Sequence, residues 1–221
     1  MARVFELVVF DWDGTLMDSA ARIVASLRAA GQDLGFEDLT DNAFRNIIGL
    51  GMQEAIRVLY PAINDQDVWQ YTDRYRHHFL GNCPMPEQLF EGVPALLAEL
   101  HRQPIMLAVA TGKSRKGLDR VLRHTDCGRY FQATRCADET TSKPHPQMLL
   151  ELIEELGVKP ETTLMIGDTE YDLEMAQRAG VASLAVTYGA HEPHRLHQYQ
   201  PLASLNSIPA LGEWFARNLK L

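Results

Sequence analysis

Two carboxylates directly follow the first apolar run of the chain. The sequence reads MARVFELVVF and then DWDGTLMDS over residues 11–19, so Asp11 and Asp13 stand where a buried strand would end. Burying unpaired charge is costly, and a tight turn with Gly14 would explain only one of the two carboxylates. Side chains two positions apart point the same way on an extended backbone. One carboxylate could therefore act as a nucleophile while the other transfers a proton.

Further polar residues stand near the ends of later apolar runs. They follow the runs at 105–110 and 163–166 or precede the helical pattern at 146–156, and they are Thr111, Gly112, Lys113, Lys143, Asp168 and Asp172. In open α/β sheets, ligands bind outside the carboxyl ends of the strands. We therefore expect all of these residues to meet at one edge of a sheet.

The elements that must position these residues alternate along the chain. The apolar runs are uninterrupted and aliphatic, as in parallel strands buried on both faces, and they cover residues 4–10, 105–110, 163–166 and 182–187. Helical patterns precede or follow them at residues 93–102, 114–123, 146–156 and 168–179. This alternation predicts an α/β fold with a doubly wound, Rossmann-like parallel sheet.

One connection is too long for an ordinary crossover between strands. Residues 19–86 contain four helical patterns in succession, at 20–34, 41–48, 52–60 and 65–80. We interpret the segment as a small helical domain inserted after the first strand, with Pro84 and Pro86 at its exit. The expected domains are therefore residues 1–18 with 87–221, and residues 19–86. The alternative is a set of peripheral helices packed on the sheet.

Four short motifs, in this order, resemble those of the haloacid dehalogenase (HAD) superfamily. Asp11-Trp12-Asp13-Gly14-Thr15-Leu16 resembles its first motif, Thr111-Gly112 its second, Lys143-Pro144 its third, and Gly167-Asp168-Thr169-Glu170-Tyr171-Asp172 its fourth. The helical insert lies where that superfamily has a mobile cap. The stretches DGTLMDS, TGKSRKGL and SKPHP most resemble the phosphoglycolate phosphatase-like members. The resemblance implies a Rossmann-like core with a cap and a hydrolase activity.

Phosphoryl transfer gives each of these residue types a task, because it needs a nucleophile, charge neutralisation and a proton for the leaving group. Asp11 would attack in line and form an aspartyl phosphate, while Asp13 would protonate the leaving oxygen and then activate water. Thr111 and the N–H of Gly112 would hold phosphate oxygens. We expect Lys143 and Mg²⁺ to keep Asp11 ionised.

Mg²⁺ is the expected cofactor, since it prefers oxygen ligands and shares its shell with waters and substrate phosphate. Asp11 and Asp168 would supply carboxylate oxygens, and the resemblance adds the backbone carbonyl of Asp13. Asp172 lies one helical turn beyond Asp168, so both side chains can face the site. We assign Asp172 a supporting or water-mediated role.

Other residues are weaker candidates. In similar enzymes the loop corresponding to residues 45–51 contacts the non-phosphate part of the substrate, so Arg45 is a candidate contact; the alternative is an arginine on the helix surface. Lys113 is a candidate phosphate contact. Asp18 or Ser19 is expected to cap the first helix of the insert.

Three histidines, His191, His194 and His197, recur every three residues, a spacing that would allow a metal site. Pro193 interrupts any helix at this point. A solvated loop is therefore the preferred interpretation.

Composition limits the partners of the 221-residue chain. A formal net charge of −8 argues against binding to nucleic acid or to anionic membranes. The apolar runs are too short to span a bilayer, and the N-terminus is a poor signal peptide. The three cysteines show no CxxC spacing, so neither a disulfide framework nor a cysteine metal site is indicated. We expect a cytoplasmic protein, monomer or homodimer, whose partner is a small phosphorylated metabolite.

Together these features predict a Mg²⁺-dependent phosphatase, a phosphoric monoester hydrolase that works through an aspartyl phosphate. Asp13 favours P–O cleavage, because dehalogenases of the superfamily lack an acid/base aspartate there. Phosphonate-cleaving members add a cap lysine, and residues 19–86 contain no lysine. The resemblance makes 2-phosphoglycolate the first candidate substrate, with pyrophosphate or a sugar phosphate next. A sugar phosphomutase of the β-phosphoglucomutase type would use the same motifs, and a non-catalytic binding module is the third alternative.

Overall fold

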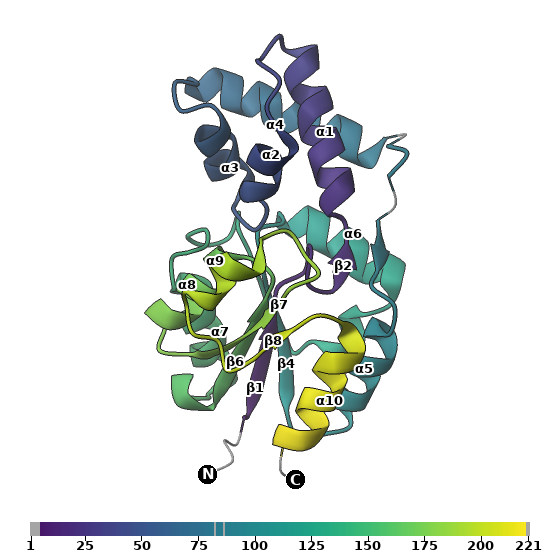
Figure 1. Cartoon of the computed structure of the whole chain (residues 1–221), viewed down its shortest axis with the longest axis vertical. Coiled ribbons are helices and arrows are strands. Elements are labelled where there is room, and N and C mark those ends of the chain that lie inside the picture. The colour runs from purple at the N-terminus through teal and green to yellow at the C-terminus, as the bar shows by residue number, and fades with distance from the viewer. Residues whose placement is uncertain (1–4, 82, 86, 220–221) are drawn as a thin grey trace.

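A six-stranded parallel sheet forms the lower part of the computed structural model, which describes residues 5–81, 83–85 and 87–219 (Figure 1). The strand order is β5-β4-β1-β6-β7-β8. The strands are β1 (Leu7–Phe10), β4 (Met106–Thr111), β5 (Ala133–Cys136), β6 (Thr163–Gly167), β7 (Ala182–Val186) and β8 (Ser204–Leu205). The predicted α/β class with a parallel, doubly wound sheet is confirmed.

The central strand β1 is buried on both faces, as its unbroken apolar sequence requires. Val8 and Phe10 join the core on one face, formed with α5 (Val93–His101), α6 (Arg115–Thr125) and α10 (Ile208–Asn218). Leu7 and Val9 join the core on the other face, formed with α7 (Gln147–Leu156) and α8 (Glu170–Arg178). The strand order reverses between β1 and β6, so a crevice is expected at their carboxyl ends.

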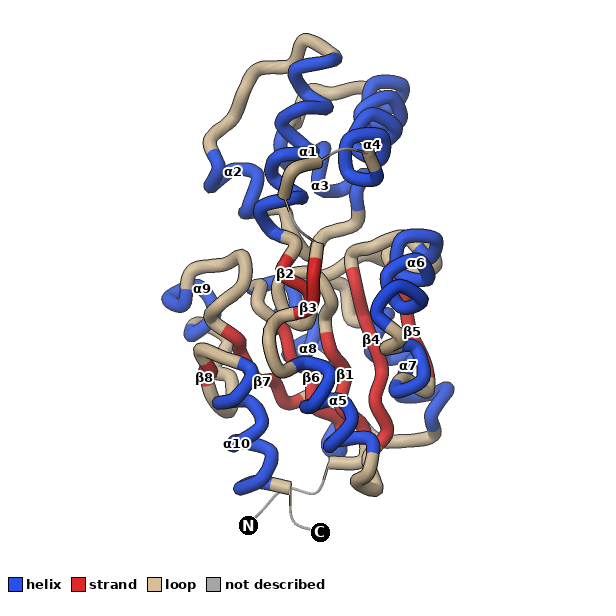
Figure 2. The backbone as a smooth tube through the Cα atoms, turned by 90° about the vertical axis from the view of Figure 1, so that its right-hand side faces the viewer, coloured by secondary structure: helices blue, strands red, loops and turns tan. Residues whose placement is uncertain are grey.

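A second hydrophobic cluster holds the helical group, which we define as α1 (Ala20–Asp33), α2 (Asp41–Asn46), α3 (Met52–Leu59) and α4 (Asp65–Leu80). Its apolar side chains pack on one another, and the hydroxyl of Tyr71 donates to the carbonyl of Leu27 at 2.8 Å. The group lies above the carboxyl ends of the strands (Figures 1 and 2).

The junction below the helical group is a two-stranded antiparallel sheet, β2 (Met17–Asp18) with β3 (Gln88–Leu89), in which Met17 pairs with Leu89. The division of the chain after residues 18 and 86 stays a prediction. Pro84 follows the end of α4, and Pro86 lies outside the described residues.

Several elements are shorter than the sequence patterns predict, or were not predicted at all. The first strand begins at Leu7, and Val4 lies outside the described residues. The edge strands β5 and β8 were missed, as was α10; two short 3-10 helices lie at Gly128–Tyr130 and Pro160–Thr162. β5 escaped the apolar pattern because its central residues Thr134 and Arg135 are polar.

The expected solvated loop around the three histidines is wrong in two respects. Pro193 begins the short helix α9 (Pro193–His197) instead of breaking it, because the first helical position needs no backbone N–H donor. His191 is buried, with 3% of its surface exposed, whereas His194 and His197 are exposed.

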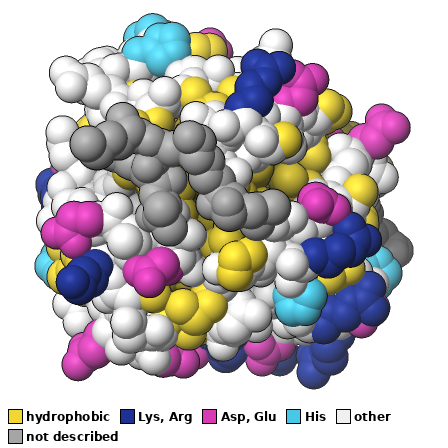
Figure 3. Space-filling model, turned by 90° about the horizontal axis from the view of Figure 1, so that it is seen from below, with side chains coloured by type: hydrophobic (Ala, Val, Ile, Leu, Met, Phe, Trp, Pro, Cys, Tyr) yellow, Lys and Arg dark blue, Asp and Glu magenta, His cyan; other side chains and the backbone are white. Residues whose placement is uncertain are grey.

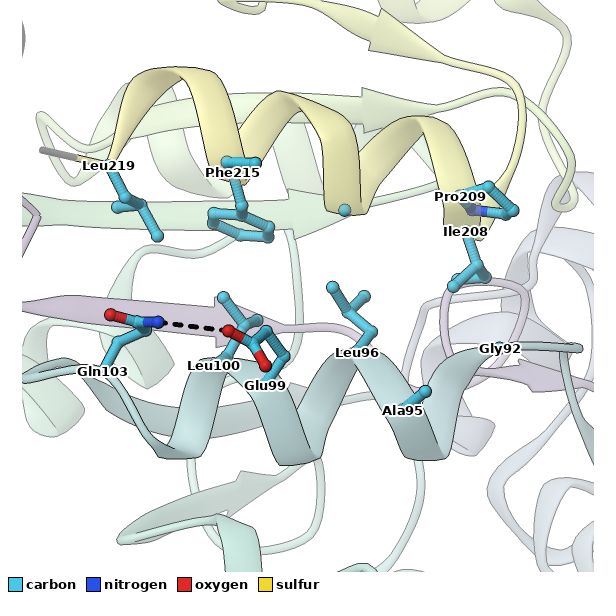
Figure 4. A pocket seen from close by; sticks show the side chains of 12 residues that line it. Gly92, Ala95, Leu96, Glu99, Leu100, Gln103, Ile208, Pro209, Phe215 and Leu219 are labelled. Atoms are coloured by element: carbon cyan, nitrogen blue, oxygen red, sulfur yellow. Dashed lines mark hydrogen bonds between the residues drawn. The ribbon is translucent and has the colours of Figure 1, made fainter.

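An apolar pocket of about 460 Å³ lies between α5 and α10 (Figure 4). Leu96, Leu100, Ile208 and Phe215 point toward it from the two helices. On the face of the molecule that is seen from below, hydrophobic side chains lie among charged ones (Figure 3). The described side chains that line the pocket include no cluster of metal-binding or nucleophilic groups. This pocket is therefore not a candidate active site.

Two further expectations concern cysteines and membranes. Cys83, Cys127 and Cys136 are free thiols, as their spacing suggested. Across the described residues, no helix has both the length and the apolar composition needed to cross a bilayer.

Candidate active site

Residues from all four motifs meet at the carboxyl ends of β1, β4 and β6. Asp11 follows β1, Thr111 ends β4, Asp168 follows β6, and Lys143 arrives from the loop between β5 and α7. All four side chains are buried. The ammonium of Lys143 lies 2.7 Å from Oδ1 of Asp11 and 2.6 Å from Oδ1 of Asp172. The structure therefore brings together residues that are separated by up to 161 positions in the chain.

The start of α8 fixes the orientation of Asp172. Thr169 is the N-cap, and its backbone N–H and hydroxyl both donate to Oδ2 of Asp172, at 3.1 and 2.7 Å. This reciprocal capping box satisfies helix-end donors and holds the carboxylate in one position. Oδ1 is then left for Lys143. Asp172 thus acts on the site through the ammonium that it shares with Asp11.

Glycines make room for the carboxylate of Asp168. Its Oδ1 accepts from the hydroxyl of Thr15 at 2.8 Å, and its Oδ2 accepts from the backbone N–H of Ala190 at 2.7 Å. A Cβ at Gly14 or at Gly189 would lie 2.1 or 2.2 Å from Oδ2. Gly14 also has a φ of +86°, which favours glycine. The Gly-Thr pair after Asp13 therefore serves to seat Asp168 against the first motif.

The carboxylates of Asp11, Asp168 and Asp172 form a group that fits a divalent cation. One oxygen from each lies within 4.8 Å of the others. Oδ2 of Asp11 is buried and has no hydrogen-bond partner among the described residues. Burial, opposed by Lys143, raises the pKa of Asp11 well above its usual value, and burial together with Asp172 raises the pKa of Asp168 to about 7. A hard cation such as Mg²⁺ would supply the missing positive charge.

Asp13 lies in a different environment from Asp11. Its Oδ1 accepts a hydrogen bond from the hydroxyl of Ser19 at 2.6 Å and lies 2.9 Å from the ammonium of Lys113. The side chain of Asp13 is not part of the three-carboxylate group. Ser19 occupies the N-cap position of α1, but its hydroxyl makes no capping bond because it bonds to Asp13 instead. The two carboxylates of the first motif therefore have separate partners.

Comparison with known proteins identifies the family of the chain. The family description "Haloacid dehalogenase-like hydrolase" matches residues 8–186. The chain belongs to this family. It is 36% identical over 201 residues to the "Probable phosphatase IndB" of Dickeya dadantii (strain 3937), covering 88% of this chain and 86% of that one.

Two other matches extend the comparison. The phosphoglycolate phosphatase of Aquifex aeolicus (strain VF5) is 29% identical over 184 residues, covering 83% of this chain and 85% of that one. The crystal structure of a hydrolase from Pseudomonas syringae covers both chains completely with a TM-score of 0.88 and 18% identity, which shows the shared fold. The predicted family and fold are confirmed.

A pocket of about 420 Å³ separates the sheet core of this HAD-like hydrolase from its helical group. Both Asp11 and Asp13 line it, as do Thr111, Gly112 and Lys113. The loop between α2 and α3 contributes Ile47, Ile48, Gly49 and Leu50. Arg45, in the last turn of α2, is not among the described residues that line this pocket. Lys113 points its ammonium to Asp13 and lies 3.6 Å from Oε1 of Glu87.

The helical group contacts the core closely through this loop. The N–H of Gly51 donates to the hydroxyl of Ser142 at 2.7 Å, next to Lys143 in sequence. A Cβ at Gly112 would lie 2.6 Å from the carbonyl oxygen of Leu50. On the other side, the hydroxyl of Tyr171 donates to the carbonyl of Asn46 at 2.8 Å. These contacts hold the α2–α3 loop against the core beside the pocket.

Sequence reasoning missed the residues that orient the motif side chains. Thr169 had a usable signal, since Thr followed three residues later by Asp is a helix-start pattern. Ser142 had none, because its partner Gly51 is 91 residues away. Glu87 likewise could not be assigned, because its partners are distant in sequence: Lys113 lies in the turn after β4, and Arg120 lies on α6.

Proposed function

We propose that this HAD-like hydrolase is a Mg²⁺-dependent phosphatase of small phosphorylated metabolites, with Asp11 as the nucleophile and Asp13 as the acid/base. The contrast between the two carboxylates carries the proposal. Oδ1 of Asp11 is held by Lys143, whereas Oδ2 is buried with no hydrogen-bond partner in the described structure and is free to attack. Asp13 is held by Ser19 and Lys113, beyond the three-carboxylate group.

The reaction divides into two steps. An oxygen of Asp11 forms a bond to phosphorus while the bond between phosphorus and the leaving oxygen breaks, and Asp13 gives that oxygen its proton. Water then attacks the aspartyl phosphate, Asp13 takes a proton from the water, and Asp11 is released as a carboxylate. Thr111 and the N–H of Gly112, at the end of β4, would hold phosphoryl oxygens throughout.

The Mg²⁺ site and Lys143 have different electrostatic roles. Asp11 and Asp168 would hold Mg²⁺, the backbone carbonyl of Asp13 would add a ligand, and Asp172 would support the site through Lys143. When bound, Mg²⁺ neutralises charge on the phosphoryl oxygens. Lys143 keeps Asp11 oriented, and its own pKa is raised because the attraction of Asp11 and Asp172 outweighs the effect of burial.

We further propose that the helical group, within residues 19–86, is a cap that excludes bulk water during the reaction. Contacts of the α2–α3 loop with Ser142 and Gly112 support this role. Names of relatives, among them a phosphatase and a phosphoglycolate phosphatase, support a phosphate monoester as substrate, with 2-phosphoglycolate as the first candidate. Arg45 stays a weaker candidate for substrate contact than the loop residues that line the pocket.

The test is a screen of phosphorylated metabolites for release of inorganic phosphate in the presence of Mg²⁺. Acid quenching during turnover should trap one phosphoryl group on the peptide that contains Asp11, detected by mass spectrometry. Asp11→Asn should lose at least about a thousandfold in kcat/KM and form no such adduct. Phosphate release by Asp11→Asn at the wild-type rate would contradict the mechanism. Conversion of a hexose 1-phosphate to its isomer without free phosphate would identify a mutase instead.

A further inference from the structure

The pocket between the core and the helical group is larger than a two-carbon leaving group needs. Its volume of about 420 Å³ equals the space of about fourteen liquid water molecules at roughly 30 Å³ each. Pockets of this size usually enclose larger ligands. The inference that follows rests on the phosphatase proposed above and concerns the leaving group of its substrate.

One wall of the pocket is apolar and belongs to the helical group. Ile23 lines it from α1, Met52 from α3, and Tyr75, Phe79 and Leu80 from α4. Such a wall removes apolar surface of a ligand from water, which favours binding. A leaving group that fills this side of the pocket therefore has an apolar framework.

The cationic residues that line the pocket lie mainly on α6. Lys116, Arg120 and Arg123 all line the pocket, and their spacing of four and three residues places them on one face of the helix. At 1.5 Å per residue this face extends about 10 Å, too far for all three to contact a single phosphoryl group. Arg76 of α4 lines the same pocket. We call these four residues the cationic wall.

Two of these four cations have no carboxylate partner within the described structure, and Arg76 lies 3.8 Å from Oδ1 of Asp73. Neither Lys116 nor Arg123 forms an ion pair with a described residue, whereas Arg120 pairs with Glu87 at 2.6 Å. Nε of Arg120 is nevertheless buried without a hydrogen-bond acceptor among the described groups. The Arg120 side chain as a whole is 38% exposed, so a ligand can reach it although Nε itself is covered.

The cationic residues of the pocket contrast with the negative net charge of the whole chain. The formal net charge is −8, yet three carboxylates line the pocket among the described residues, and two of them, Asp11 and Asp13, belong to the first motif; the third is Asp138. Oδ1 of Asp138 accepts from the backbone N–H of Arg115 at 2.8 Å. A local positive surface in a cleft attracts anionic ligands even when the protein as a whole is negative.

We propose that the leaving group carries a second anionic group, a carboxylate or a second phosphate, which binds the cationic wall while the apolar framework packs against Tyr75 and Phe79. The transferred phosphoryl group then lies at Asp11 and the second anion lies toward α6. This arrangement selects phosphate monoesters of acidic alcohols over neutral esters, and the pocket has room for acidic alcohols larger than glycolate.

A matched pair of substrates tests the proposal. 4-Carboxyphenyl phosphate and 4-carbamoylphenyl phosphate have nearly the same shape and differ in charge, and 1,4-phenylene bisphosphate supplies a second phosphate. We expect the carboxylate or the bisphosphate to exceed the carboxamide in kcat/KM by at least about tenfold, the effect of one charge-assisted hydrogen bond. The preference should fall as ionic strength rises.

Substitutions on α6 test whether its cations cause the preference for the anionic substrate. In Lys116→Gln/Arg123→Gln the ratio of anionic to neutral substrate should approach one. Arg217→Gln removes an exposed cation on α10, away from the pocket, and should leave the ratio unchanged. A ratio near one in the wild-type protein, or a ratio that survives the double variant, would overturn the proposal.

Non-hydrolysable ligands separate this proposal from the phosphatase itself. Binding of 4-carboxybenzylphosphonate and 4-carbamoylbenzylphosphonate is measured by calorimetry with Mg²⁺ present. A tenfold preference for the carboxylate that is lost in the double variant supports the cationic wall even if no ester is hydrolysed. If both esters are hydrolysed and both phosphonates bind with equal affinity, the proposed phosphatase activity stands and the second anion site is refuted.

Discussion

The ammonium of Lys143 lies 2.7 Å from Oδ1 of Asp11, with no more than 1% of either side chain exposed. The same ammonium lies 2.6 Å from Asp172, so two buried carboxylates share one cation, and Asp168 lies beside them. Breaking a buried ion pair by removing one partner leaves an uncompensated charge. Lys143 is therefore expected to support both the fold and the reactivity of Asp11.

Replacement of this ammonium is the first prediction. Lys143→Met should lower the free energy of unfolding by about 3 kcal/mol in chelator at neutral pH, because Asp11 and Asp172 lose their counter-charge. Phosphatase activity should fall by at least about a thousandfold, because Asp11 loses its orientation. Denaturant unfolding and phosphate release measure the two effects.

The control for this substitution is Lys159→Met, which removes an exposed ammonium and should change neither quantity. Adding Asp172→Asn to Lys143→Met removes one of the unpaired charges and should recover part of the lost stability. Equal stability of wild type and Lys143→Met in chelator would contradict the electrostatic role.

Removal of the metal is the second prediction. Mg²⁺ at about 100 times its dissociation constant should add about 2.7 kcal/mol to the free energy of unfolding, and chelator should remove that gain together with the activity. Asp168→Asn should abolish the gain, because Asp168 belongs to the three-carboxylate group. Asp138→Asn makes the same change of charge at the pocket rim and should retain it. If Mg²⁺ raised the free energy of unfolding of Asp168→Asn as much as that of the wild type, the cation would have to bind at another site.

The sequence was sufficient to predict how the motif residues converge, because parallel strands bring their carboxyl ends to one edge. Asp11, Thr111 and Asp168 each follow or end a strand whose apolar run is unmistakable. Edge strands lack that signal: β5 contains the partly buried Arg135, which pairs with Glu151 and Glu155. Single-face burial and short length hide such strands from a search for continuous apolar runs.

The partners of the motif residues could not be predicted, because they depend on how the helical group sits on the core. Ser19 resembles a helix cap, yet its hydroxyl bonds to Asp13. His191 stands in a polar stretch with a proline, yet it is buried at the contact with Asn46. In both cases a long-range contact replaces the local interaction that the sequence suggests.

Close approach at Gly112 leads to the third prediction. A Cβ there would lie 2.6 Å from the carbonyl oxygen of Leu50 and 2.7 Å from that of Gly49, and backbone atoms cannot move aside cheaply. Gly112→Ala should displace the α2–α3 loop, raise KM and lower kcat together, by about tenfold or more in kcat/KM. Steady-state kinetics measure the effect.

The matched control is Gly212→Ala on α10, where the nearest atom to a Cβ lies 3.9 Å away. This change should leave the kinetics unaltered and stabilise the helix by about 1 kcal/mol. Wild-type kinetics in Gly112→Ala would show that the loop does not need its close contact with the core.

The buried imidazole of His191 gives the fourth prediction, a dependence of stability on pH. Its Nδ1 accepts from the N–H of Glu170 at 3.2 Å, and its Nε2 lies 3.1 Å from the carbonyl oxygen of Asn46, which is consistent with a neutral ring protonated at Nε2. Burial first, and then the charge of Arg195, lower the pKa of His191, although Glu170 and Asp172 oppose this.

Because the folded protein holds this histidine neutral, the unfolded chain takes up the proton first as the pH falls below about 6.5. The free energy of unfolding should therefore decrease between pH 7 and pH 5. His191→Gln should be less stable than wild type at pH 7.5 but should show a shallower decrease, measured by urea unfolding across that range. His194→Gln replaces an exposed imidazole on α9 and should retain the wild-type slope. Equal slopes in His191→Gln and wild type would assign the dependence to other groups, and the contact between α2 and His191 would then carry no pH sensitivity.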